Sequence, residues 1–193
     1  MSPRLRPLPP ADLDDAQRAV YDAVAGGRRA QGPQAFPLTA PDGSLRGPFN
    51  AFLLAPALGG PLQEVGAAVR FRTALPDRAR EIAVLVVATV HGSAFERAAH
   101  EAVGRTVGLR DDELEALREN AFEVLSGTEA VVARTAHALA AGGDLDDERY
   151  AEAIGALGEA GLFELLTLVG YYALLALQLR VFRVDGPGSS AGR

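Results

Sequence analysis

Two acidic residues and one histidine stand at positions where they could carry out acid–base chemistry. Glu96 and His100 are four residues apart in a segment with helical periodicity, which places both side chains on one face of a helix. A carboxylate beside an imidazole fixes the ring tautomer and makes the ring a stronger base. Glu81 lies in the preceding apolar segment, where a carboxylate needs a partner. The pattern predicts a catalytic group of His100, Glu96 and Glu81.

Each of these residues also has a purely structural interpretation. Ser93 and Glu96 have the spacing of a capping box, so Glu96 could simply satisfy backbone donors at the start of a helix. His100 could be a hydrogen-bonded histidine of the core or of a subunit interface. Glu81 could pair with one of three arginines, namely Arg78, Arg80 or Arg105. Of the other histidines, His91 is expected at a helix end, and His137 on a surface helix.

Two residue types that support much of enzyme chemistry are absent. The chain has no cysteine and no lysine, so all 19 of its basic side chains are arginine. Thiol peroxidase, disulfide-exchange and thiolate–metal chemistry are therefore excluded within the chain, as are Schiff-base catalysis and a phosphate-loop lysine. The pair Glu96 and His100 has no second pair at metal-ligand spacing. We predict no metal, and no cofactor because no nucleotide-binding motif is present.

Composition favours a single domain that binds neither nucleic acid nor membrane. The chain has 193 residues, 48% of them apolar, and a net charge of −6, and its arginines form no basic face of the kind that nucleic acids need. Glu164 and Gln178 interrupt its most apolar stretch, which favours a core or interface helix over a membrane anchor. Residues 1–10 lack the apolar segment of a secretory signal, so we predict a cytoplasmic protein.

Hydrophobic periodicity predicts an all-α fold of about eight helices in one domain over residues 1–193. We expect an extended arm at 1–10, a long loop at 28–48 and a tail at 186–193. The apolar run 82–90 has the β-propensity of a strand, but its length and charged opening favour a buried helix. The predicted helices cover 12–25, 48–54, 58–75, 77–90, 93–107, 109–119, 126–141, 146–160 and 162–181.

Three stretches form one recognisable pattern: Arg-Glu-Ile-Ala-Val-Leu-Val-Val-Ala at 80–88, Phe-Glu-Arg-Ala-Ala-His at 95–100 and Gly-Leu at 108–109. This pattern resembles the core motif of the carboxymuconolactone decarboxylase family. The alkylhydroperoxidase branch of that family uses a glutamate, a Cys-x-x-Cys pair and a histidine. The glutamate falls on Glu81 and the histidine on His100, whereas Ser93 and Glu96 occupy the two cysteine positions. The resemblance implies an alkylhydroperoxidase-like helical bundle without a peroxidase relay.

The resemblance covers residues 45–185 and includes Gly-Pro-Phe-Asn at 47–50. It implies a homo-oligomer, a trimer or a hexamer, in which the apolar stripe at 165–179 is buried. The residue after the motif glutamate is often Trp in such proteins, and here it is Arg97. An arginine facing the pocket would favour a polar or anionic substrate. The predicted substrate-binding residues are Arg46, Asn50, Arg97 and Ser93.

Together these observations predict a cofactor-free lyase of the decarboxylase type, acting on a small carboxylated lactone or related organic acid. His100 would be the general acid–base, oriented by Glu96 or Glu81, and an arginine would hold the anionic group. The alternative is a non-catalytic small-molecule-binding or scaffold protein on the same fold. Alkylhydroperoxidase-type activity would need the thiols of a partner. Convergence of the three residues on one concave pocket would favour the enzyme.

Overall fold

The structure is a computed structural model that describes residues 3–31 and 34–184. Within these ranges it contains eight α-helices, two single-turn 3-10 helices and no strand, so the predicted all-α fold is confirmed. The predicted tail at 186–193 lies outside the described residues. The helices are α1 (Asp15–Ala25), α2 (Pro48–Phe52), α3 (Pro56–Phe71), α4 (Asp77–Val90), α5 (Ala94–Thr106), α6 (Asp111–Glu119), α7 (Gly127–Gly142) and α8 (Asp147–Phe182).

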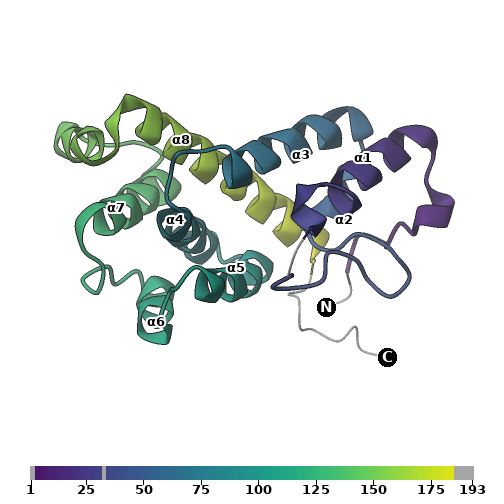
Figure 1. The fold of residues 1–193 in the computed structure, drawn as a ribbon, viewed down its shortest axis with the longest axis horizontal. Coiled ribbons are helices and arrows are strands. Elements are labelled where there is room, and N and C mark those ends of the chain that lie inside the picture. The colour runs from purple at the N-terminus through teal and green to yellow at the C-terminus, as the bar shows by residue number, and fades with distance from the viewer. Residues whose placement is uncertain (1–2, 32–33, 185–193) are drawn as a thin grey trace.

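The helices form two groups that α8 connects (Figure 1). On one side, α4 packs against α5, α6 and α7; on the other, α3 packs against α1 and α2. Helix α8 runs along both groups and contacts α2, α3, α4 and α7. A cavity between the two groups receives side chains from α5 on one wall and from α2, α3 and α8 on the others.

Helix α4 is the centre of the core because its sequence is apolar on every side. All residues from Ala79 to Ala88 are buried, including the charged residues Arg80 and Glu81. A helix that is apolar all round is stable only when neighbours cover its whole circumference, and four helices do so here. The prediction that 82–90 forms a helix rather than a strand is confirmed. A carboxylate on such a helix is automatically placed in the interior.

Several predicted helix boundaries differ from the structure by a few residues, and local hydrogen bonding explains the difference at the start of α1. Helix α1 begins at Asp15, three residues later than predicted, because Asp14 caps it. The Asp14 side chain accepts from the backbone N–H of Gln17 at 2.8 Å, and the Gln17 side chain accepts from that of Asp14 at 3.1 Å. This reciprocal capping box fixes the start of the helix. The preceding residues, Pro10–Asp12, form a 3-10 turn instead.

For α8 the sequence predicts two helices that meet near residue 161, and the structure contains such a division. The backbone break falls at Gly158, where φ is 68° and ψ is 173°. A positive φ is readily adopted by glycine but not by residues with a Cβ. Glycine at this position lets the chain turn between two helical segments, so the predicted pair of helices is confirmed, with the break a few residues earlier than predicted. By length and composition α8 could cross a membrane, although a single such helix is weak evidence.

Helix α8 has one face in the core and one face exposed. Leu165, Leu168 and Leu175 are buried within the chain itself, so much of the stripe expected to pack in an oligomer belongs to the core of one chain. The exposed face carries five large apolar residues, Phe163, Leu166, Leu174, Leu177 and Val181. The predicted homo-oligomer stays a prediction that the mass of the particle in solution will test, and this exposed face is the surface it would bury.

Candidate active site

The imidazole of His100 on α5 contacts the carboxylate of Glu81 on α4. The distance from Nδ1 to the nearer carboxylate oxygen is 2.7 Å, and both residues are buried. With an ionised Glu81, Nδ1 is the nitrogen that carries the proton and donates it, which leaves Nε2 as the second ring nitrogen. Because His100 lines a cavity, this tautomer presents an unprotonated nitrogen as a base for a bound molecule.

The arginines that could have paired with Glu81 are engaged elsewhere. Arg78 binds Glu113 and Glu129 in a network at the opening of α4. Arg105 pairs with Asp111. Arg80 reaches Glu81 only at 3.9 Å and forms its shorter ion pair with Asp77, at 2.8 Å. The structural interpretation of Glu81 as an ordinary arginine partner therefore does not hold, and its closest partner is His100.

Glu96 is a buried carboxylate for which no hydrogen bond is found among the described residues. Both of its oxygens are enclosed, and only 3% of the residue is exposed. The capping-box interpretation fails, because neither Ser93 nor Glu96 satisfies the backbone at the start of α5. Burial raises the pKa of Glu96 to about 7, and the nearby Ser93 hydroxyl opposes this only partly. Glu96 can therefore gain or lose a proton near neutral pH.

Glu96 and His100 line the same cavity, which has a volume of about 30 Å³. This space holds little more than water. Two tyrosines of α8 close it: the Tyr172 ring packs edge-on against His100 at 5.1 Å between centroids, and Tyr171 packs edge-on against Tyr172 at 5.5 Å. Burial raises the pKa of Tyr171 to about 12, so its hydroxyl stays protonated at working pH and can donate a hydrogen bond.

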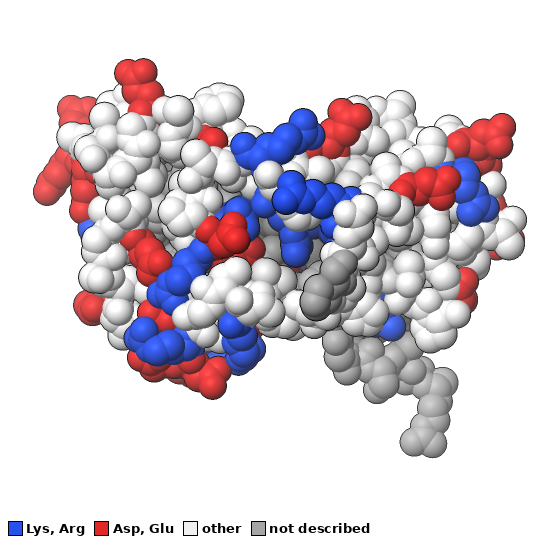
Figure 2. Space-filling model, in the orientation of Figure 1, with Lys and Arg blue, Asp and Glu red and all other residues white. Residues whose placement is uncertain are grey.

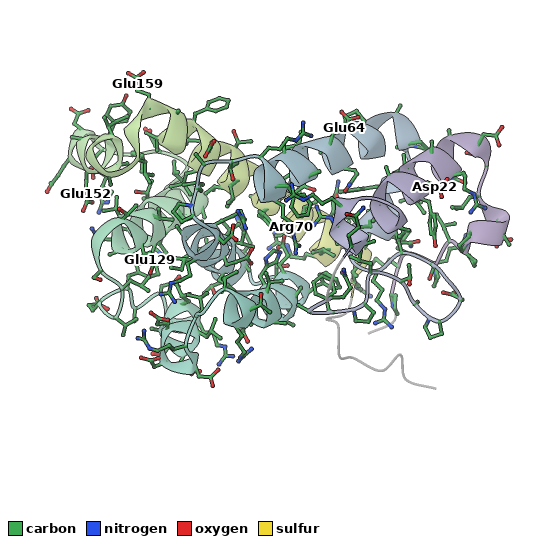
Figure 3. The ribbon with its side chains drawn as sticks, viewed as in Figure 1. Asp22, Glu64, Arg70, Glu129, Glu152 and Glu159 are labelled. Carbon is green, nitrogen blue, oxygen red and sulfur yellow. The ribbon has the colours of Figure 1, made fainter. Side chains whose placement is uncertain are left out.

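A second cavity of about 370 Å³ adjoins the first, because Arg29, Phe36 and Arg70 line both. Figure 2 shows basic side chains gathered around a hollow near the centre of one face, and Figure 3 labels Arg70 at that place. Sequence reasoning missed Arg29, Arg70 and the roles of the tyrosine pair. The long loop at 28–48 was a signal for Arg29, whereas nothing in the sequence marked Arg70.

Three of the four predicted substrate-binding residues lie away from the two cavities and have other contacts. Asn50 is buried and holds the N-terminal arm, since its amide accepts from Leu8 N–H at 3.1 Å and donates to the carbonyl of Arg6 at 2.9 Å. Arg46 donates to the carbonyl of Thr39 at 3.1 Å. The Ser93 hydroxyl is buried without a hydrogen bond among the described residues. None of these side chains lines either cavity.

Arg97, the fourth predicted binding residue, is half-buried on α5. It does not line either cavity. The replacement of Trp by Arg at this position therefore does not change the cavity walls. The remaining histidines are also separate from the site. His91 ends α4, where burial lowers its pKa, and His137 packs against the Phe122 ring at 5.7 Å.

The position of Tyr171 depends on a glycine of α3, which leads to a stability prediction. A Cβ added at Gly66 would lie 2.2 Å from the Tyr171 hydroxyl oxygen. We expect Gly66→Ala to lower the free energy of unfolding by about 1–3 kcal/mol, measured by urea denaturation. Gly60→Ala on the same helix is the matched control, because its Cβ would meet only Val20 at 3.8 Å.

Removing the hydroxyl should repair the clash. The double variant Gly66→Ala/Tyr171→Phe is expected to regain part of the lost stability, because the atom closest to the new Cβ is gone. Equal stability of Gly66→Ala and Gly60→Ala would contradict the described placement of Tyr171.

The fold and the site together define an all-α protein with a buried histidine–glutamate pair, in a chain without cysteine. The model of the Carboxymuconolactone decarboxylase family matches residues 56–141. The matched segment contains no cysteine. The match includes α4 and α5, which supply Glu81, Glu96 and His100. No curated protein matches the chain.

Solved structures share the fold over nearly the whole chain. An alkylhydroperoxidase AhpD core protein from Ralstonia eutropha JMP134, described as an uncharacterized peroxidase-related protein, has a TM-score of 0.76 at 11% identity, covering 96% of this chain and 93% of that one. A peroxidase-related protein from Silicibacter sp. TM1040 gives 0.71 at 13%, covering 100% and 96%. The debrominase Bmp8, as a variant bound to 2,3,4-tribromopyrrole, gives 0.71 at 13%, covering 96% and 92%. At these identities the likeness establishes the fold alone.

Proposed function

We propose that this protein is a cofactor-free lyase of the decarboxylase type, acting on a small carboxylated lactone or a related organic acid. The observation that carries the proposal is the convergence of two buried acid–base groups on one cavity. His100 presents Nε2 because Glu81 holds Nδ1 at 2.7 Å, and Glu96 lines the same space as a carboxyl group with a pKa of about 7. The match of the family model to residues 56–141 supports an enzyme-like function at that general level.

The reaction needs no group that the chain lacks. The bond between the substrate carbon and its carboxylate breaks, carbon dioxide leaves, and the electron pair moves into a conjugated carbonyl or lactone of the substrate. A protonated Glu96 or His100 then delivers a proton to the carbon. A buried site favours loss of the substrate carboxylate. The carboxylate ion is poorly solvated there, and decarboxylation removes this cost by converting it to neutral carbon dioxide. Glu81 stays hydrogen-bonded to Nδ1 throughout and keeps the imidazole oriented.

Replacement of the cysteine pair favours this chemistry over peroxide reduction. By the family resemblance, Ser93 and Glu96 occupy the two cysteine positions, and Glu96 is the one that lines the cavity. A carboxyl group can transfer a proton but cannot form the disulfide that a thiol peroxidase needs. Purified protein is therefore expected to consume no peroxide with a thiol reductant.

The proposal is tested with a panel of small carboxylated lactones and β-keto or conjugated acids in deuterated buffer. We expect release of one carbon dioxide per substrate and one deuterium at the carbon that lost the carboxylate, detected by mass spectrometry. Binding of these acids without any carbon dioxide would favour the non-catalytic alternative. The same assay on boiled protein measures the uncatalysed background.

A further inference from the structure

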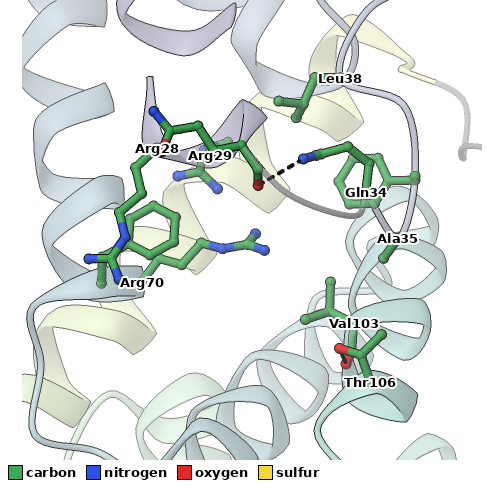
Figure 4. Close-up of a pocket in the computed structure, with 11 residues that line it drawn as sticks. Arg28, Arg29, Gln34, Ala35, Leu38, Arg70, Val103 and Thr106 are labelled. Carbon is green, nitrogen blue, oxygen red and sulfur yellow. Dashed lines mark hydrogen bonds between the residues drawn. The ribbon is translucent and has the colours of Figure 1, made fainter. Parts of the chain in front are cut away.

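The larger cavity has a chemistry of its own. Three arginines line it, Arg28 and Arg29 from the loop after α1 and Arg70 from the end of α3. Among the described residues, no acidic side chain contributes to its walls. Figure 4 shows the guanidinium of Arg70 pointing into the open space, with Gln34, Val103 and Thr106 around it. In a chain with a net charge of −6, this is a local concentration of positive charge.

None of the three guanidinium groups has a carboxylate partner within the described part of the chain. They are instead arranged around aromatic rings. Arg28 and Arg70 lie 4.8 and 5.5 Å from the centroid of the Phe71 ring, and Arg29 lies 4.9 Å from that of Phe49. By contrast, Arg78 and Arg105 are paired with acidic residues. Three arginines held together without an ion-pair partner repel one another, and an anion between them would relieve that repulsion.

Arg29 shows this strain most directly. Its Nε is buried and has no hydrogen bond among residues 3–31 and 34–184. Burial lowers the pKa of the Arg29 guanidinium below its ordinary value, and the charge of Arg70 lowers it further. A buried donor without an acceptor is destabilising by roughly 1–3 kcal/mol. A bound anion would supply the missing acceptor for this donor, which is a physical reason for an arginine to be buried here.

We infer that Arg28, Arg29 and Arg70 form a binding site for a dianionic group, such as a phosphate or a pair of carboxylates. This group would belong to the part of the substrate that lies outside the small cavity lined by Glu96 and His100. The volume of about 370 Å³ holds a small organic acid. The adjoining cavity of about 30 Å³ admits little beyond the reacting group. Bidentate guanidinium contacts suit both phosphate and carboxylate oxygens. This inference deepens the proposed function, but binding can be measured without turnover.

The test is calorimetric titration of the purified protein with inorganic phosphate, malonate and acetate at low ionic strength. We expect phosphate or malonate to bind more tightly than acetate by about tenfold or more, because a second charge meets the extra guanidinium groups. The tighter of the two dianions identifies the geometry that the site prefers. Affinity should fall as sodium chloride is added. Equal binding of acetate and both dianions would overturn the inference.

Variants locate the site. Arg70→Gln is expected to weaken dianion binding about tenfold or more, and Arg70→Lys, which keeps the charge but loses the bidentate fork, should lie between it and the natural protein. The matched control is Arg134→Gln, which removes a charge from an exposed pair with Glu152 and should change affinity less than twofold. Equal losses in Arg70→Gln and Arg134→Gln would reject the site.

The two proposals can fail separately. Dianion binding that depends on Arg70, together with no carbon dioxide release from any acid, would support the anion site and reject the lyase. Decarboxylation with unchanged KM in Arg70→Gln would support the lyase and reject the anion site. A circular dichroism spectrum and a denaturation midpoint for each variant exclude misfolding as the cause of lost binding.

Discussion

Replacing His100 with glutamine is expected to lower the turnover of carboxylated substrates by about 100-fold or more. The glutamine amide fills a similar volume and can still hydrogen-bond to Glu81, but it cannot take up and release a proton at neutral pH. The loss should appear in kcat more than in KM, because the imidazole acts on the reacting atoms rather than on the charged end of the substrate. Steady-state kinetics on the best acid of the panel measures the effect.

The histidine on α7 provides the control for this experiment. His137 packs against Phe122 and lies outside both cavities, so His137→Gln removes the same group without touching the site and should leave turnover unchanged. Glu81→Gln should lower turnover less than His100→Gln and should change the shape of the pH–rate profile, because Glu81 acts through the imidazole. Near-normal turnover of His100→Gln would end the proposed mechanism.

Replacing Glu96 with glutamine is expected to make the protein more stable at pH 8 and less active. Glu96 is buried without a hydrogen bond in the described structure, and its pKa is raised from 4.5 to about 7. Between these values the native chain binds more protons than the unfolded chain, so stability falls as pH rises. The stability that neutral Glu96 contributes is fully present below pH 4.5 and is lost as pH passes 7. Glutamine stays neutral and keeps it.

The expected gain for Glu96→Gln follows from the size of the pKa change. A rise of about 2.5 units corresponds to roughly 3 kcal/mol in the free energy of unfolding, measured by urea denaturation at pH 8. Near pH 4.5 the variant and the natural chain should differ little. Glu159→Gln is the control, because Glu159 is exposed on α8 and its replacement should show no such pH dependence. A stability difference that does not change with pH would contradict the assigned environment of Glu96.

A gain in stability together with a loss of turnover would have a clear meaning. Proteins tolerate a buried charge without a partner mainly where chemistry needs it. Glu96 destabilises the fold whenever it is ionised, whereas a neutral residue of the same shape would not. The two measurements on one variant therefore test whether this carboxyl group serves the reaction or is simply an unfavourable residue of α5.

The sequence by itself determined the helical architecture. Periodicity predicted the helices from α1 to α7 to within a few residues, because each has an apolar side that recurs every three to four positions. It also predicted a helix at α4 against the β-propensity of Ile82 and its neighbours. The exact ends depended on local hydrogen bonds, as with Asp14, and on the backbone freedom of Gly158. Periodicity, capping and glycine breaks each depend on a short stretch of chain, so they are encoded in the local sequence.

The tertiary structure decided which side chains meet. Spacing placed Glu96 beside His100, yet the residue that binds the imidazole is Glu81, 19 positions earlier on another helix. Arg29 and Arg70 reach the site from α3 and the loop before it, whereas the expected Arg46 and Arg97 do not. A single helix fixes only neighbours three or four residues apart. Which groups share a cavity depends on how the helices pack, and that is set by the whole core rather than by any local pattern.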